Sequence, residues 1–332
     1  MTETRAFVCF IIVFCVALTG CAKNEAPALS ETRVLLDTFC TLTIYGSADD
    51  AMLEEAFELC ARYEELLSIS LEGSDVRRVN HAGGDAAQVD PGTAELLRAG
   101  LGFGEYSGGL FDVTVGRLSS LWDFSGDPRV PSGSELAAAL ATVGFDRVEV
   151  NGNTVRLADP GAWIDLGGIA KGYIADRLAD FLAERGVVGA VIDLGGDVAL
   201  VGAKPDGSQW AIGIREPFGG PGELLGVVGT GEAAIVTSGV YERMFIEGGE
   251  RYHHILDPAT GMPVSTDIVS ATVLAESAVA GDALSTIAVL AGSGSAPGLL
   301  AGAPEFIGAL LVLDSGEIVQ LGEIEFRQFG DH

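Results

Sequence analysis

The chain has 332 residues, of which 48% are hydrophobic, and a formal net charge of −28 from 47 acidic and 19 basic residues. This length and apolar content are those of a globular protein with a substantial core. So large a negative charge repels nucleic-acid phosphates and anionic lipid head groups, and we therefore exclude nucleic-acid binding.

Residues 1–20 have the pattern of an export signal, because Arg5 precedes the apolar run "AFVCFIIVFCVAL", which is short for a membrane span. The run ends at "LTGC", which resembles the lipobox of bacterial lipoproteins, in which the cysteine, here Cys21, becomes the lipidated first residue. The alternative is an ordinary cleaved signal with a chance cysteine. Residues 21–32 are polar and unpatterned and suit a tether. We expect an exported protein, lipid-anchored at the cell membrane and facing the periplasm or the outside.

The rest of the chain predicts one large α+β domain over residues 33–330, with mixed, mostly antiparallel strands and packed helices. A strand over 33–45 and an amphipathic helix over 49–67 precede a loop rich in turn residues and a helix that begins at "PGTAELL". "DRVEVNGNTVRLAD" predicts a hairpin, because alternating runs flank Asn-Gly-Asn. Strands dominate from residue 145 onward, with helices at 169–185 and 279–291. No linker composition marks a boundary inside the domain.

Two cysteines remain in the predicted domain. Cys40 lies on the alternating apolar face of the first strand, and Cys60 lies on the apolar stripe of the first helix. Both have the pattern of small buried hydrophobic residues, and we expect free thiols, although an oxidising compartment would allow them to pair.

"DLGGIAKGYIADRL" passes from a strand through paired glycines directly into a helix. The start of such a helix presents free N–H groups and the positive end of its dipole, and Lys171 in its first turn adds a charge. These features suit a phosphate site, while a plain strand-to-helix turn that needs glycine explains the same residues. The spacing is that of neither a P-loop nor a dinucleotide-binding G-x-G-x-x-G motif.

"AGDALSTIAVLAG" places Asp282 and Thr286 one helical turn apart on the same face. A carboxylate and a hydroxyl so arranged suit Mg²⁺, which binds few protein ligands and completes its shell with water and phosphate oxygens. The alternative is an acid on a helix surface beside a tolerated threonine.

"RYHHILDPATG" contains His253 and His254, two of the four histidines in the chain. Adjacent residues of a strand point to opposite faces, so we do not expect both rings to bind one ion. Ser238, with His254 and Asp257, suggests a serine-hydrolase triad, but the G-x-S-x-G elbow is absent, and we reject that interpretation.

Eight segments occur in the order found in the ApbE family, the FAD:protein FMN transferases, and the chain resembles that family over about residues 35–325. They are "DTFCTLTIYG", "LLSISLEGSDVRRVN", "FDVTVGRLSSLWDF", "DLGGIAKGY", "DLGGDV", "TSGVYER", "YHHILDPATG" and "DALST". The resemblance implies an ApbE/T-fold-like domain that binds FAD with Mg²⁺. It also implies transfer of the FMN half to a threonine or serine hydroxyl of a partner flavoprotein through a phosphoester, with release of AMP.

The resemblance also implies roles for individual residues. Side chains of Asp282 and Thr286, with the carbonyl of Ala170, are the implied metal ligands, and His254 is the implied base. The implied flavin-nucleotide contacts are Asn80, Asp112, Thr114, Gly168, Lys171 and His254. The implied partners are acceptor flavoprotein subunits of membrane redox complexes. Two alternatives use the same site: a Mg²⁺-dependent FAD pyrophosphatase that releases FMN and AMP, and a non-catalytic lipoprotein that holds FAD.

Overall fold

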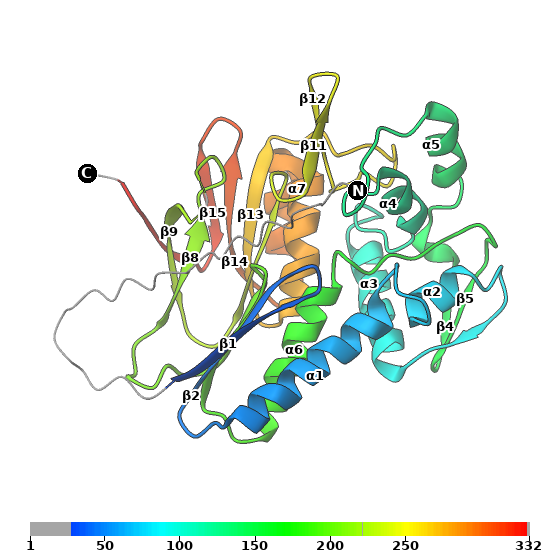
Figure 1. Cartoon of the computed structure of the whole chain (residues 1–332). Helices are drawn as coiled ribbons and strands as arrows, with labels where there is room; N and C mark the ends of the chain where they lie inside the picture. Colours follow the sequence, from blue (N-terminus) through cyan, green and yellow to red (C-terminus); the bar gives the residue numbers. More distant parts are fainter. Residues whose placement is uncertain (1–27, 221, 331–332) are drawn as a thin grey trace, which may run out of the picture.

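A computed structural model describes residues 28–220 and 222–330, so the predicted signal segment and Cys21 lie outside the described part. A large sheet forms the centre of the molecule (Figure 1), with long helices on one face and a smaller sheet on the other. A group of shorter helices and strands, residues 75–157, stands beside the long helices, and we call it the helical lobe.

The large sheet has eight strands, and every neighbouring pair is antiparallel. This confirms the predicted α+β class with mostly antiparallel strands. In spatial order the strands are β1 (Ala28–Leu35), β2 (Thr38–Tyr45), β6 (Gly189–Leu194), β7 (Val198–Gly202), β10 (Ala234–Gly239), β13 (Ile268–Ala275), β14 (Phe306–Leu313) and β15 (Ile318–Gly322).

Both faces of this sheet are buried, which explains why its central strands are apolar without alternation. On β14, "FIGALLVL", the side chain of Leu311 packs toward the long helices, whereas Leu310 packs toward the smaller sheet. Ala234 and Ile235 divide in the same way on β10. The smaller sheet consists of β16 (Glu325–Gln328), β9 (Leu224–Thr230) and β8 (Trp210–Arg215).

Three helices cover the other face: α1 (Asp50–Leu67), α6 (Ala170–Glu184) and α7 (Ala278–Ala301). Among the described residues, α7 is the one helix long and apolar enough to span a membrane by length and composition. It packs against β10 and β13 as a core helix, and its backbone leaves helical geometry at Gly292, where φ is 67°.

The helical lobe contains α2 (Asp75–Asn80), β3 (Ala87–Gln88), α3 (Pro91–Tyr106), α4 (Gly116–Trp122), α5 (Gly133–Leu140), the short 3₁₀ helix η1 (Phe145–Arg147), β4 (Val148–Asn151) and β5 (Thr154–Leu157). The last two strands confirm the hairpin predicted at Asn-Gly-Asn. A separate two-stranded hairpin, β11 (Met244–Glu247) and β12 (Glu250–His253), rises beside α4 and α5 (Figure 1).

The structure differs from the sequence prediction at the start of the domain. The strand predicted over 33–45 is a hairpin, because Leu36 and Asp37, both with φ of 56°, turn the chain between β1 and β2. Strand β1 begins at Ala28 and therefore includes residues 28–32 of the predicted tether. Cys40 and Cys60 are buried free thiols, as expected.

Candidate functional site

The first turn of α6 lies directly against the start of α7. The backbone N–H of Gly172 donates a hydrogen bond of 3.0 Å to Oδ2 of Asp282. A β-carbon at position 172 would lie 2.8 Å from Cβ of Asp282 and 2.7 Å from the carbonyl carbon of Ala278, closer than real β-carbons approach. The side chain of Ile169, the residue before α6, forms no capping hydrogen bond with the helix. Glycine at 172 thus lets the Asp282 carboxylate reach the free N–H groups of another helix.

A second carboxylate, that of Asp197, reaches the same place. It is 1% exposed, and its Oδ2 atom lies 2.9 Å from Nζ of Lys171, the second residue of α6. Asp197 follows Gly195 and Gly196, whose φ values of 71° and 99° turn the chain between β6 and β7. The segment "DLGGDV" belongs to the family resemblance, but no residue in it is among the predicted site residues. The available signal was an acid placed directly after a glycine pair at a strand end.

These charged groups perturb one another's ionisation. Burial and then the charge of Asp197 raise the pKa of Asp282 to about 8, although Lys171 and the Gly172 N–H act in the opposite direction. Burial also raises the pKa of Asp197, against the charge of Lys171. Burial alone would lower the pKa of Lys171, but Asp197 and Asp282 outweigh it and raise that pKa. Two buried carboxyl groups thus lie around one ammonium group, and a divalent cation bound there would favour the ionised form of Asp282 that the raised pKa disfavours.

Thr286 lies one turn after Asp282 on α7, as the sequence predicts. Its Oγ1 atom is 3.1 Å from Oγ of Ser238 on β10, which lies 2.8 Å from Oγ of Ser285. In the described part of the chain no group of three or more His, Cys, Asp or Glu side chains is arranged to hold a metal. A metal here would therefore use the Thr286 hydroxyl and the Ala170 carbonyl as well as the Asp282 carboxylate. These are the hard oxygen ligands that Mg²⁺ binds, so the residues fit that ion.

The two adjacent histidines have different surroundings. His253 ends β12 and is 8% exposed, and its Nε2 atom lies 3.2 Å from the carbonyl oxygen of Val264. Because the partner is a carbonyl, Nε2 carries the proton and donates. The ring of His254 forms no hydrogen bond within residues 28–220 and 222–330, and its Nδ1 atom is buried. Its backbone N–H donates to the carbonyl of Arg243 at 3.0 Å. Among the described residues, the His253 ring therefore has a hydrogen-bond partner and the His254 ring has none.

Burial, followed by the positive charges of Arg243 and His253, lowers the pKa of His254 to about 4. The ring is therefore neutral at neutral pH and has one nitrogen that can accept a proton. Lys171 adds to this lowering, because its positive charge also acts on the ring of His254. An anionic substrate held between them would raise the pKa of His254 toward the range in which a base is effective.

Three of the implied flavin contacts lie in the segments that support this junction. Asn80 is buried, and its amide bonds both backbone groups of Ile164, at 2.8 and 2.7 Å. Asp112 accepts from the N–H and the hydroxyl of Thr114 and from the N–H of Phe145. These polar groups are already satisfied within the protein, and they fix the strand-like run that leads into α6. Their flavin contacts stay a prediction.

Gly168 lies two residues before α6 and is exposed. A β-carbon there would meet the ring of Phe111 at 3.5 Å, which is an ordinary contact. Packing within the protein therefore does not require glycine here, and the exposed backbone is open to the approach of a ligand.

Among the described residues, no hydrogen bond joins Ser238, His254 and Asp257, so they do not form a catalytic triad. The Ser238 hydroxyl is shared with hydroxyls on α7. Asp257 accepts from the N–H of Ala259 and the hydroxyl of Thr260 inside its own turn. This agrees with the missing nucleophile elbow.

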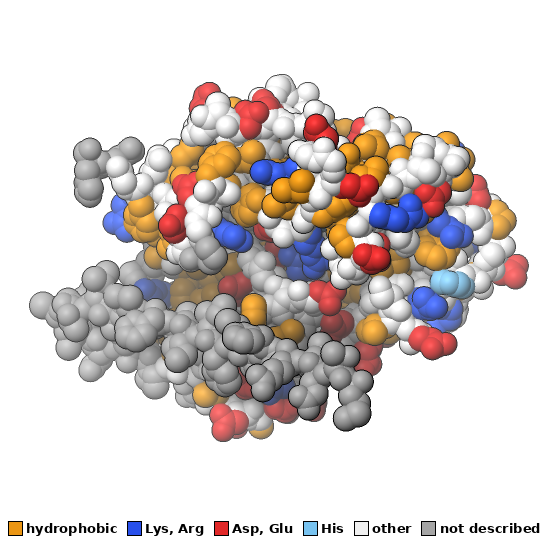
Figure 2. Space-filling view, turned by 45° about the horizontal axis from the view of Figure 1, so that its top comes forward, with side chains coloured by type: hydrophobic (Ala, Val, Ile, Leu, Met, Phe, Trp, Pro, Cys, Tyr) orange, Lys and Arg blue, Asp and Glu red, His pale blue; other side chains and the backbone are white. Residues whose placement is uncertain are grey.

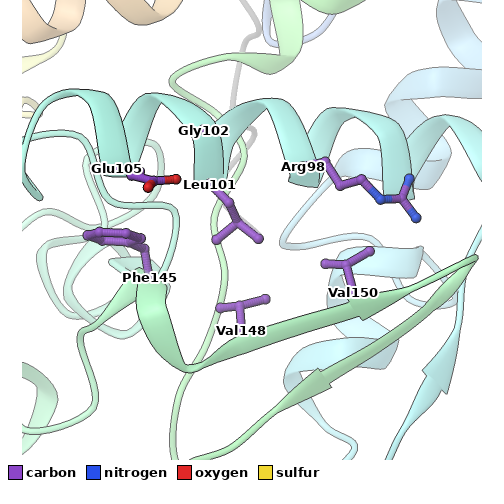
Figure 3. A pocket seen from close by; sticks show the side chains of 7 residues that line it. All are labelled: Arg98, Leu101, Gly102, Glu105, Phe145, Val148 and Val150. Carbon is purple, nitrogen blue, oxygen red and sulfur yellow. The ribbon is translucent and has the colours of Figure 1, made fainter.

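A groove of about 400 Å³ lies elsewhere, between α3 and the segment of η1 and β4 (Figure 3). Its lining combines apolar side chains with one acid and one base, and none of the predicted site residues is among them. The lining residues are Arg98, Leu101, Gly102, Glu105, Phe145, Val148 and Val150.

Comparison with known proteins identifies the family of the chain. The model of the ApbE family matches residues 36–311. The chain belongs to the ApbE family. The FAD:protein FMN transferase of Treponema pallidum is 34% identical over 284 residues, which cover 79% of this chain and 78% of that protein. The protein of the same name from Klebsiella pneumoniae is 35% identical over 269 residues, which cover 80% and 83%.

Solved ApbE structures share the fold. The ApbE protein of Thermotoga maritima superimposes with a TM-score of 0.82 at 33% identity, over 89% of this chain and 97% of that one. The flavin transferase ApbE of Vibrio cholerae superimposes with a TM-score of 0.78 at 27% identity, with the same coverage. The ApbE fold therefore extends over nearly all of the described part, including the α6–α7 junction.

Proposed function

We propose that this ApbE-family chain transfers FMN from FAD to a serine or threonine hydroxyl of an acceptor protein. The observation that carries the proposal is the junction of α6 and α7, where Gly172, Lys171, Asp197 and Asp282 bring a helix N-terminus, an ammonium and two carboxylates together. Relatives that carry the name FAD:protein FMN transferase align over about four-fifths of the chain. Helix N-termini and lysine side chains are common ligands of phosphate groups.

In the proposed step the acceptor hydroxyl oxygen attacks the phosphorus of the FMN half. The bond from that phosphorus to the bridging oxygen breaks, AMP leaves with that oxygen, and a phosphoester joins FMN to the acceptor. His254 takes the hydroxyl proton, because its neutral ring forms no hydrogen bond among the described residues. Lys171 and the N–H groups of α6 balance the charge of the phosphate oxygens.

The proposal includes a Mg²⁺ ion held by Asp282, Thr286 and the carbonyl of Ala170. When bound, the ion would neutralise the phosphate oxygens and help hold the pyrophosphate in position. Without a cation, an incoming pyrophosphate would meet the buried carboxylate of Asp197 and the carboxyl group of Asp282, with one ammonium group between them. The chain's net charge of −28 adds to that repulsion, so a cation is needed at this place.

We place the remaining implied contacts around the flavin. The exposed backbone of Gly168 would contact it, whereas Asn80, Asp112 and Thr114 would hold the residues that lead into α6. The acceptors we propose are flavoprotein subunits of membrane redox complexes. A chain that modifies such subunits would gain from an anchor at the same membrane, and Cys21 would supply it through a lipid. Cys21→Ser should release the protein from membranes in a fractionation experiment, and a membrane-bound variant would contradict the anchor.

The function is tested by incubating the protein with FAD, Mg²⁺ and a purified acceptor domain that has an exposed threonine, followed by mass spectrometry of the acceptor. We expect the mass of the acceptor to increase by that of one FMN group in phosphoester linkage, with one AMP released for each FMN attached. Release of FMN and AMP without an adduct would identify a pyrophosphatase instead. FAD that stays intact through long incubation would identify a flavin-holding protein.

A further inference from the structure

The hairpin of β11 and β12 is anchored to the helical lobe through one of its faces. Phe245 and Tyr252 lie opposite each other in the register, and their rings lie 6.2 and 5.4 Å from the ring of Trp122. At the end of the hairpin the N–H of Val130 donates to a carboxylate oxygen of Glu247 at 3.3 Å. These contacts fix the hairpin, so its opposite face is presented in a defined position.

That opposite face consists of exposed apolar and basic side chains, apart from His253, which lies opposite Met244 and is buried. Met244 is 43% exposed and Ile246 is 65% exposed, and successive side chains alternate between the faces of a strand. Arg251 is directly opposite Ile246 in the register and is also exposed. It forms no salt bridge within the described part of the chain, although acids outnumber bases 47 to 19 in the sequence. We call Met244, Ile246 and Arg251 the outer hairpin face.

At the buried ring of His253 the outer hairpin face reaches the segment that contains the proposed base. His253 ends β12, and His254 follows it directly, three residues after Arg251. Extended chain advances about 3.3 Å per residue, so about 10 Å separates Arg251 from the proposed base along the strand. Within the described residues, β11 and β12 pair with no third strand. Figure 2, which turns the hairpin end forward, shows hydrophobic side chains gathered on this side of the molecule with Lys and Arg among them.

We propose that the outer hairpin face docks the acceptor protein of the transfer reaction. The occupant is an extended acceptor segment that has an apolar side chain and a carboxylate within a few residues of its reacting hydroxyl. The apolar side chain would bury Met244 and Ile246, and the carboxylate would pair with Arg251. This inference rests on the proposed function, because only a protein substrate needs a surface of this kind beside the base.

The test is steady-state FMN transfer by the full chain to a purified acceptor domain that the wild type modifies, at saturating FAD and Mg²⁺. The Met244→Ser/Ile246→Ser variant should raise the KM for the acceptor by about tenfold or more, since truncating the few side chains at the centre of an interface weakens binding by such a factor. The affinity for FAD and the rate at saturating acceptor should stay at wild-type values.

Val188→Ser is the matched control for Ile246→Ser. Val188 is 67% exposed, against 65% for Ile246, but it lies directly before β6, at the opposite end of that strand from the turn that leads to Asp197. Its KM for the acceptor should equal that of the wild type. Arg251→Glu should raise the KM at low salt and approach the wild type at high salt, because salt screens repulsion between the new carboxylate and that of the acceptor.

The outcomes separate this inference from the proposed function. No adduct on any acceptor with the wild type would overturn the transferase function and the docking proposal together. An adduct that forms with unchanged KM in the Met244→Ser/Ile246→Ser variant would overturn docking alone. If the two serines instead release the chain from lipid vesicles while the KM stays unchanged, the outer hairpin face contacts membrane, and the proposal is equally wrong.

Discussion

The backbone N–H of Gly172 donates to the carboxylate of Asp282 across 3.0 Å, and only a residue without a side chain permits that approach. Gly172→Ala should destabilise the protein by about 1–3 kcal/mol or more, because the added methyl group overlaps Ala278 and Asp282. Gly102→Ala is the matched control: it also lies in a helix, with nothing within 4 Å of a β-carbon. It should stabilise by about 0.5–1 kcal/mol. Urea unfolding of both variants checks the opposite signs, and equal effects would show that the helices separate easily.

The ion pair of Lys171 and Asp197 predicts a non-additive stability cycle. Lys171→Met leaves the carboxylate of Asp197 buried and unpaired, and such changes cost about 3–5 kcal/mol in fully buried pairs. The Lys171 side chain is 26% exposed, so we expect a cost below that range. Adding Asp197→Leu should recover part of the loss, because it removes the unpaired carboxylate and leaves only the carboxyl group of Asp282 buried at the junction. Additive losses in urea unfolding would mean that the two groups do not interact.

The histidines predict a division between chemistry and structure. His254→Ala should lower the rate of FMN transfer by about 10²–10⁴-fold and leave FAD affinity within about tenfold, because a base acts on the acceptor hydroxyl. His253→Ala removes the hydrogen bond to Val264, so it should lower stability by about 1 kcal/mol and change transfer far less. Transfer assays and thermal melts of both variants check the ranking, and the reverse order would move the base to His253.

Asp176 on α6 predicts a pH dependence of stability. Its carboxylate accepts from the N–H groups of Ala278 and Val279 at 2.7 and 2.9 Å. Burial raises its pKa from 3.8 to about 6 even though those hydrogen bonds lower it. The folded state thus holds the proton more tightly, and the stability from this group is complete below about pH 4 and is lost as the pH rises through about 6. Asp176→Asn cannot ionise, so the wild type should lose stability relative to it over that window. Urea unfolding at several pH values checks this. If the wild type instead gained stability relative to Asp176→Asn as the pH rises, the hydrogen bonds from the start of α7 would outweigh the effect of burial on the Asp176 carboxylate.

The sequence predicts the parts of the site that depend on local periodicity. A helical repeat over 279–291 places Asp282 and Thr286 on one face, and paired glycines before "IAKGY" predict the exposed start of α6. Asp197 escaped prediction because its partner, Lys171, lies 26 residues away in the sequence, and only the β6–β7 turn brings the two together. Such contacts depend on how a sheet packs on a helix, which no short window of sequence records.

Turn chemistry explains the other misses. The hairpin at Asn-Gly-Asn is visible because those residues favour positive φ, whereas the β1–β2 turn uses Leu36 and Asp37, and leucine gives no such signal. The sequence also gives only a weak signal for the β11–β12 hairpin. Its alternation is irregular because its two apolar faces serve different contacts, Phe245 and Tyr252 on the lobe and Met244 and Ile246 at the surface.

The central claim, that the α6–α7 junction holds a divalent ion against the FAD pyrophosphate, is tested most directly by the rate of FMN transfer against Mg²⁺ concentration. The wild type, Asp282→Ala and Thr286→Ala are compared. The carboxylate supplies charge as well as an electron pair, while water can replace a hydroxyl. We therefore predict that Asp282→Ala loses transfer almost completely at every Mg²⁺ concentration, and that Thr286→Ala recovers part of it as Mg²⁺ is raised. FAD affinity of the wild type should fall when EDTA is added. If Asp282→Ala follows the wild-type curve, the metal lies elsewhere and the junction is not the reaction centre.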